Sequence, residues 1–363
     1  MKKLEPIGKY IHLTDTRNFD LSVNNLVGLT VEKRFIPSVA NVIGTDLSKY
    51  KVIKQGQFAC SLMQVSRDGK MPVAMYKGEP AIMSPAYPIF EVQDENNLLP
   101  EYLHMYLSRP EFDREAVFRA VGGVRGSLDW NDFIEMKIPI PDIDEQRKIV
   151  AEYQTIEKRI ENNNRLIKVL EETAQNIYYH TFVENIDPEN LPEGWRVEPF
   201  YNYFDAKYGK GLATEFIEEQ GLYPVYGANG VIGYYDEKTC DNYRVLITSR
   251  GSGSGDISRT YYKESFVTNN AFVVYPKKNY EYCELPYIYC LLCNSNVKQF
   301  VSGSAQPQLT NADMNVFKIV FPKKENIEDF CRQTSPLFQN TILLFEENNR
   351  LQKILPLLLS KLS

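Results

Sequence analysis

Several residue types that catalysis or membrane insertion would need are scarce in this chain. Its 363 residues include only three histidines, His12, His104 and His180, and these do not have metal-ligand spacing. No apolar run reaches the roughly 20 residues that cross a bilayer. No apolar stretch of the signal-peptide type follows Lys2 and Lys3. We therefore expect a cytoplasmic protein that does not bind a membrane.

The sequence also lacks the motifs of common enzymes. It contains no Gly-x-x-x-x-Gly-Lys-Ser/Thr phosphate loop, no Asn/Asp-Pro-Pro-aromatic tetrapeptide, no glycine-rich turn for S-adenosylmethionine and no Gly-x-Ser-x-Gly elbow. The carboxylates are scattered and nominate no acid–base pair. We therefore interpret the chain as non-catalytic, with no metal and no cofactor of its own.

The six cysteines predict neither a disulfide framework nor a zinc site. The pair Cys290-x-x-Cys293, with Cys283 nearby, is compatible with zinc, but no second such pair or histidine pair follows. Free cysteine behaves as a small buried hydrophobe. Thiols packed in the core are therefore the favoured interpretation.

The net charge of −6 is unevenly distributed. Residues 1–140 sum to 0, residues 141–190 to −5, residues 191–322 to −2 and residues 323–363 to +1. Most of the acidic excess thus lies in one segment of predicted helix. A nucleic-acid-binding protein needs a basic face and not a basic total, so this composition permits one.

The chain reads as two copies of one plan. The segment from Leu128 to Lys137, which leads into a short apolar strand and a proline, matches the segment from Leu309 to Lys318 at an offset of 181 residues. Further on, 163–166 and 348–351 share the sequence Asn-Asn-Arg-Leu at an offset of 185 residues. Each copy is predicted to run from a globular domain through this strand into a long helix.

Both helices show a heptad pattern. The first is expected from about Asp144 to His180, and the second from about Asn326 to the C-terminus with a kink at Pro356. We predict that they pair antiparallel, although each could instead pack on its own domain. The expected pairing or partner-docking residues are Gln146, Arg147, Ile156, Ile160, Asn163, Ile167, Leu344, Asn348 and Leu351, and leucines recur at 337, 344, 351 and 358.

The predicted fold class is α+β with an internal pseudo-two-fold repeat. Two mixed α/β domains are expected at 1–141 and 191–322, each with many short strands. The helical segments at 142–190 and 323–363 are expected to hold them apart, and Asp187-Pro188 and Leu191-Pro192 mark a linker.

Polar, glycine-rich loops are the candidate nucleic-acid contacts. The loop 248–259 follows a strand; it either presents amides and hydroxyls to phosphate and an arginine to guanine, or is a flexible hairpin. Residues 66–70 are its counterpart in the first copy, and the loops 122–127 and 302–308 precede the proline strands. The nominated residues are Arg67, Lys70, Lys77, Arg125, Ser127, Lys207, Lys210, Ser249, Arg250, Ser252, Ser254, Arg259, Gln306 and Gln308.

Two motifs resemble a known family. The stretch 138–150, Ile-Pro-Ile-Pro-Asp-Ile-Asp-Glu-Gln-Arg-Lys-Ile-Val, is similar to the junction in specificity subunits of type I restriction–modification systems. The stretch 191–197, Leu-Pro-Glu-Gly-Trp-Arg-Val, resembles the opening of a second target-recognition domain in that family. Two departures stand out: the first domain begins Pro-Ile-Gly-Lys-Tyr at 6–10, and the second junction reads Lys-Lys-Glu-Asn at 323–326.

The resemblance implies a DNA-recognition subunit. Each domain would read one half of a bipartite, asymmetric site in double-stranded DNA, with the helices as a ruler. Two methyltransferase subunits and the motor-nuclease subunits would dock on the chain and would carry the S-adenosylmethionine, ATP and magnesium of the complex.

Other interpretations remain open. A related subunit of a methylation-only or fused system has the same pattern. A coiled-coil scaffold with two protein- or carbohydrate-binding domains belongs to another class, and an enzyme has no motif in its favour.

Overall fold

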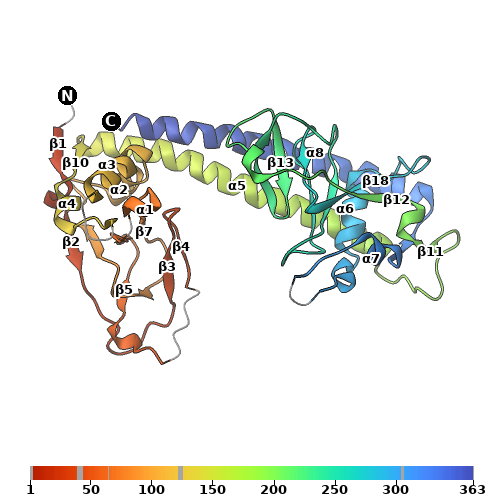
Figure 1. Cartoon of the computed structure of the whole chain (residues 1–363), viewed down its shortest axis with the longest axis horizontal. Coiled ribbons are helices and arrows are strands. Elements are labelled where there is room, and N and C mark those ends of the chain that lie inside the picture. The colour runs from red at the N-terminus through yellow and green to blue at the C-terminus, as the bar shows by residue number, and fades with distance from the viewer. Residues whose placement is uncertain (1–2, 39–43, 64, 122–125, 304–305, 363) are drawn as a thin grey trace. The chain divides into compact units, whose positions relative to one another are not determined.

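The computed structural model describes residues 3–38, 44–63, 65–121, 126–303 and 306–362. The chain divides into two compact units, one formed by residues 1–160 with 350–363 and the other by residues 161–349. Both units combine short strands with helices, so the predicted α+β class is confirmed (Figure 1).

The two units contain four-stranded sheets of the same topology. In the first unit the order is β2-β9-β6-β7, and in the second it is β12-β18-β15-β16, so that the equivalent strands occupy equivalent places. All neighbours are antiparallel. The strands are β2 (Ile11–Thr14), β6 (Phe58–Cys60), β7 (Val73–Met75), β9 (Ile89–Val92), β12 (Phe204–Tyr208), β15 (Val245–Thr248), β16 (Ile257–Arg259) and β18 (Ala271–Pro276).

Each unit also has a two-stranded sheet at the base of its long helix. In the first unit β1 (Lys3–Pro6) pairs with β10 (Lys137–Ile140), and in the second β11 (Arg196–Pro199) pairs with β19 (Lys318–Phe321). A 3-10 turn follows each first strand, η1 (Ile7–Lys9) or η4 (Phe200–Asn202). The amide of Ile7 donates to Met136 O at 2.9 Å, and that of Phe200 donates to Phe317 O at 2.9 Å. The two openings are therefore structurally equivalent despite their different sequences.

The remaining elements surround these sheets. The repeat continues in α2 (Pro100–Leu107) with α6 (Leu285–Cys293), and in α4 (Trp130–Glu135) with α7 (Asn311–Asn315). The elements without a clear counterpart, and the smaller turns, are β3 (Val27–Leu29), β4 (Phe35–Pro37), η2 (Leu47–Lys49), β5 (Lys51–Ile53), α1 (Val65–Asp68), β8 (Ala81–Met83), α3 (Pro110–Ala120), η5 (Thr214–Phe216), β13 (Tyr223–Gly227), β14 (Gly230–Tyr235), β17 (Phe266–Val267) and η6 (Val297–Phe300).

Each unit has its own aromatic core. In the first unit Phe58 stacks on Phe90 at 5.1 Å, and Phe90 contacts Phe133 at 5.6 Å. In the second unit Tyr178 and Phe182 pack on Phe330 with ring centroids 5.7 and 5.5 Å apart. The residues of this second core include the buried Cys283, Cys290 and Cys331. Val150, a residue of the long helix 143–182, belongs to the first core, and Tyr178, Phe182 and Phe330 lie on long helices, so each core attaches its sheet to a long helix.

The long helices are α5 (Ile143–Phe182) and α8 (Lys324–Ser360), each close to its predicted bounds. Within the second unit they run antiparallel, because Asn163 of α5 contacts Asn348 of α8 whereas Tyr178 lies against Phe330. The helix α8 continues through Pro356, where the sequence predicted a kink.

The buried line of α8 differs from the predicted leucine line. Thr334, Phe338 and Thr341 are buried at 0%, 3% and 1% exposure, whereas Leu337 and Leu344 are only half-buried. Each leucine lies three residues after a buried threonine, a separation of about 60° around the helix. The heptad leucines therefore flank a buried line that also contains Asn348, one of the predicted pairing residues.

Candidate nucleic-acid interface

The structure joins the two candidate loops of the second unit. The amide of Gly251 donates to Pro307 O at 3.0 Å, and the amide of Leu309 donates to Ser249 O at 2.9 Å. Residues 249–255, 302–303 and 306–308 therefore form one surface, which we call the second loop pair. It presents the exposed side chains Arg250, Ser252, Gln306 and Gln308.

The first unit contains the equivalent junction. The amide of Leu128 donates to Leu62 O at 2.9 Å, as that of Leu309 does to Ser249 O. A Cβ added to Gly126 would lie 2.1 Å from Ser66 Oγ, so the segments that contain these residues touch. This first loop pair, residues 62–63, 65–70 and 126–128, presents exposed Arg67 and Lys70 and half-buried Ser127. Arg125 lies outside the described residues.

Two features of the first unit differ from expectation. Residues 65–68 form the short helix α1 and not a loop, and Arg67 Nε pairs with Asp68 Oδ1 at 2.7 Å. Lys77 is not part of the loop pair. It lines a separate cavity of about 730 Å³ together with Tyr153 and Gln352.

The glycine loop of the second unit uses four of its amides within the protein. The amides of Gly251, Ser254, Gly255 and Asp256 all donate to carbonyl groups of the protein. Gly251 and Gly255 have φ values of +90° and +83°, a backbone region that glycine adopts at little cost. The glycines therefore build an ordered turn, and the loop offers side chains rather than these amides to a ligand.

Three residues nominated for DNA contact are inside the protein, and those predictions were wrong. The hydroxyl of Ser249 donates to Asn269 O at 3.2 Å, and that of Ser254 donates to Gly251 O at 2.8 Å and Pro307 O at 2.9 Å. The side chain of Arg259 is 2% exposed and pairs with Glu171 at 2.7 Å. Their hydrogen bonds hold the loop and its strand in place, so they are not available to DNA.

The end of β12 extends the surface of the second loop pair. The hydroxyl of Tyr208 donates to Leu309 O at 3.3 Å, and the amide of Lys210 donates to Val267 O at 3.0 Å. Lys207 and Lys210 are exposed, with Asp205 and Glu237 as ion-pair partners at 3.6 and 3.1 Å. Sequence reasoning missed Tyr208, since one tyrosine among 24 carries no distinguishing signal.

The asparagines of the repeat meet across the helix pair of the second unit. Asn163 Nδ2 donates to Asn348 Oδ1 at 2.9 Å and to Glu347 Oε2 at 3.0 Å, and Asn348 Nδ2 donates to Asn164 Oδ1 at 2.9 Å. The predicted helix pairing is confirmed here. Of the other predicted pairing residues, Ile167 is buried and Leu344 is half-buried in this unit. Ile156, Ile160 and Leu351 belong to the first unit and are half-buried there.

Gln146 is an internal residue, not a docking residue. Its side chain accepts from Leu99 N and donates to Asn97 O and Pro141 O, each at 2.9 Å, and the residue is 0% exposed. Arg147 is exposed and pairs with Asp144 at 2.9 Å. In the second unit the position 181 residues later is Ile327, also buried, so apolar packing replaces these hydrogen bonds there.

The cysteines are core thiols, as favoured. Cys290 is buried and Cys293 half-buried, and burial raises the pKa of the Cys293 thiol to about 11. Throughout the described part of the chain, no group of three or more histidine, cysteine, aspartate or glutamate residues could hold a metal ion. Within the same residues, no helix is both long and apolar enough to span a bilayer.

These features define a class of protein: a duplicated α+β chain in which each copy joins two polar loops beside a sheet and attaches that sheet to long helices. The sequence matches the family described as type I restriction modification DNA specificity domain twice, over residues 46–172 and 192–352. The chain therefore belongs to this family, whose described role is recognition and not catalysis.

Individual relatives agree with this assignment. The chain is 31% identical over 108 residues to the EcoprrI type I restriction enzyme specificity subunit of Escherichia coli, an alignment that covers 30% of this chain and only 26% of that relative. It is 22% identical over 316 residues to the MjaIX specificity subunit of Methanocaldococcus jannaschii, covering 76% of this chain and 72% of that relative. The crystal structure of a type I restriction-modification S subunit from M. genitalium has the same fold, with a TM-score of 0.58, 20% identity and coverage of 100% and 96%.

Proposed function

We propose that this chain reads a bipartite, asymmetric site in double-stranded DNA, with one loop pair for each half. The observation that carries the proposal is the repeated junction, in which Leu128 N bonds to Leu62 O and Leu309 N bonds to Ser249 O. The fold thus brings two loops together in each unit, and the side chains they present differ. A site with two different halves follows from this difference.

The exposed side chains suit DNA recognition. An arginine can bond to O6 and N7 of guanine, and a glutamine can bond to N6 and N7 of adenine. Arg250, Gln306 and Gln308 provide these groups in the second unit. Arg67 and Lys70 provide positive charge in the first, where phosphate contacts would position the protein without reading sequence.

The helices would serve as the ruler and as the docking surface. α5 has 40 residues and α8 has 37, which corresponds to lengths of about 60 and 55 Å at the usual helical rise. We propose that two methyltransferase subunits and the motor-nuclease subunits bind this chain in the cytoplasm. Those subunits, and not this chain, would hold S-adenosylmethionine, ATP and magnesium.

The test is a genome-wide map of methylated adenine in host cells with and without the gene. If the proposal is right, deletion removes methylation from one bipartite motif and leaves other motifs unchanged. An unchanged map, in cells whose methyltransferase subunit is expressed and active, would contradict it.

A further inference from the structure

Arg259 connects the sheet of the second unit to both long helices. Its Nε and Nη2 donate to Glu171 Oε1 of α5 at 3.0 and 2.7 Å, and Nη2 also donates to Thr341 Oγ1 of α8 at 2.7 Å. The guanidinium lies 4.0 Å from the ring centroid of Tyr261 and 5.0 Å from that of Phe338. All of these residues belong to the second unit.

The geometry of this contact is tightly constrained. The side chains of Arg259 and Glu171 are 2% and 19% exposed, and the hydroxyl of Tyr261 donates to the same Glu171 oxygen at 2.8 Å. A buried ion pair adds little net stability, because desolvation offsets much of its Coulomb energy. Hydrogen bonds from a planar guanidinium are directional, however. The contact therefore restricts orientation more than it stabilises the fold.

Arg259 is also close to the second loop pair along the chain. β16 begins at Ile257, directly after the glycine turn, and Arg259 is its last residue. The amide of Thr248 donates to Asp256 O at 2.9 Å, which closes the loop at the start of the strand. At about 3.3 Å per residue, Arg259 is only about 10 Å along the strand from that closure. A change in its position is therefore transmitted to the loop.

The first unit has no such ion pair at the equivalent place. In the second sheet Arg259, the last residue of β16, lies opposite Val245, the first residue of β15. In the first sheet the same place is taken by Met75, the last residue of β7, which lies opposite the first residue of β6. Met75 is 9% exposed and belongs to the hydrophobic core of its unit. The fold therefore does not require a charged residue at this position, and the contact is specific to the second unit.

We infer that Arg259 is a positioning residue, which through Glu171 and Thr341 holds the second loop pair at one orientation on α5 and α8. The inference rests on the proposed function. If the helices set the spacer between half-sites, a loosened contact lets the second loop pair reach a half-site displaced by one base pair. Arg259 would thus determine spacer selectivity without touching DNA.

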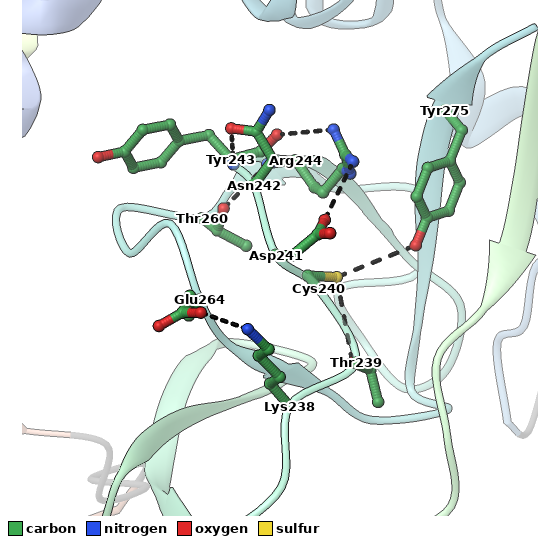
Figure 2. A network of polar contacts seen from close by, with 10 residues as sticks. All are labelled: Lys238, Thr239, Cys240, Asp241, Asn242, Tyr243, Arg244, Thr260, Glu264 and Tyr275. Carbon is green, nitrogen blue, oxygen red and sulfur yellow. Dashed lines mark hydrogen bonds and ion pairs between the residues drawn. The ribbon is translucent and has the colours of Figure 1, made fainter.

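The matched control is Arg244. It also lies over a tyrosine ring, that of Tyr275 at 4.9 Å, and it pairs with Asp241 at 3.8 Å. Figure 2 shows polar contacts of Arg244 with Asp241, with the Tyr243 carbonyl and, through its amide, with Thr260, none of which lies on α5 or α8. Replacing it removes a half-buried arginine whose hydrogen bonds and ion pair do not involve α5 or α8.

The experiment uses the complete methyltransferase complex and a DNA library in which the mapped motif has its native spacer or a spacer one base pair shorter or longer. Methylation is measured for wild type, Arg259→Met, the double variant Arg259→Met/Glu171→Met, and Arg244→Met. We expect Arg259→Met to reduce the preference for the native spacer about tenfold, the effect of one lost hydrogen bond to a charged group. Arg259→Met should keep the wild-type base preference within both half-sites. Arg244→Met should keep the wild-type spacer preference.

The double variant separates positioning from the effect of an unpaired carboxylate. It leaves no buried charge, so it should fold, and it should still show the relaxed spacer preference. An equal loss of methylation at all spacers, or recovery of the native preference in the double variant, would overturn the inference. The methylation measured with the wild-type complex tests the proposed function separately. A chain that does not read a bipartite site would give no motif-dependent methylation at any spacer length.

Discussion

Replacing Gln146 with alanine should destabilise the first unit locally rather than abolish partner binding. The side chain is completely buried where α5 begins, and its amide group bonds to three backbone groups, Leu99 N, Asn97 O and Pro141 O. These contacts join the start of α5 to the segment that precedes α2. Alanine would remove all three bonds and leave a small cavity.

The magnitude can be worked out from these contacts. A donor left without a partner in a buried site costs about 1–3 kcal/mol, and each of the other two hydrogen bonds contributes about 1 kcal/mol. We expect the local free energy of opening to fall by about 3 kcal/mol, near the lower end of this sum, because water can reach some of the backbone groups that lose their partner. Because 1.36 kcal/mol corresponds to a factor of ten, the amides of residues 97–103 should exchange with solvent roughly 100-fold faster.

Hydrogen exchange read by mass spectrometry tests this prediction, because it reports opening segment by segment. Arg147→Ala is the control, since that neighbouring side chain is exposed and has only an ion pair with Asp144. It should change exchange by less than about fivefold, as surface ion pairs contribute about 0–1 kcal/mol. An acceleration below about fivefold in Gln146→Ala would refute the reasoning, as would an equal effect of the two variants.

Two further predictions concern a glycine and a histidine. A Cβ at Gly209 would lie 2.3 Å from Val267 O and 2.4 Å from Thr268 O, whereas at Gly211 the nearest atom is 4.0 Å away. Gly209→Ala should therefore lower the free energy of unfolding of the second unit by about 3 kcal/mol or more, as overpacking does, and Gly211→Ala should not; equal denaturation midpoints would contradict this. Burial, with Lys77 and Lys33 nearby, lowers the pKa of His104 to about 4. Because only the unfolded chain takes up this proton between about pH 6.5 and 4, the first unit should lose about 2 kcal/mol as the pH falls through that range. Urea unfolding at pH 7 and 4.5 measures the loss, and an equal loss in His104→Gln would assign it to another group.

Much of the fold could be predicted because the repeat constrains it. The matching spacing of Leu128–Lys137 and Leu309–Lys318 located the strands and helices that end each copy. The pairing of β1 with β10 was not predicted, although a signal exists. Glu5-Pro6 and Glu198-Pro199 stand at equivalent places, 193 residues apart, and each pair ends the first strand of its unit. A two-residue match is too short to be recognised before the strands are known.

The candidate site could be predicted only at the level of its loops. Glycine and polar residues located both loops of each unit, and Arg250, Gln306 and Gln308 are exposed. Whether an individual side chain faces outward depends on contacts with distant segments. Arg259 is buried because α5 and α8 supply Glu171 and Thr341, which lie 88 and 82 residues away along the chain. No local pattern carries that information.

The central claim is that each loop pair reads one half of the DNA site. Its most direct test is a methylated-adenine map in cells that carry Arg250→Ala/Gln308→Ala in place of the wild-type chain. We expect the base preference to change or relax in one half of the motif only, with the other half and the spacer retained, because both residues belong to the second loop pair. An unchanged motif, or equal changes in both halves, would contradict the account.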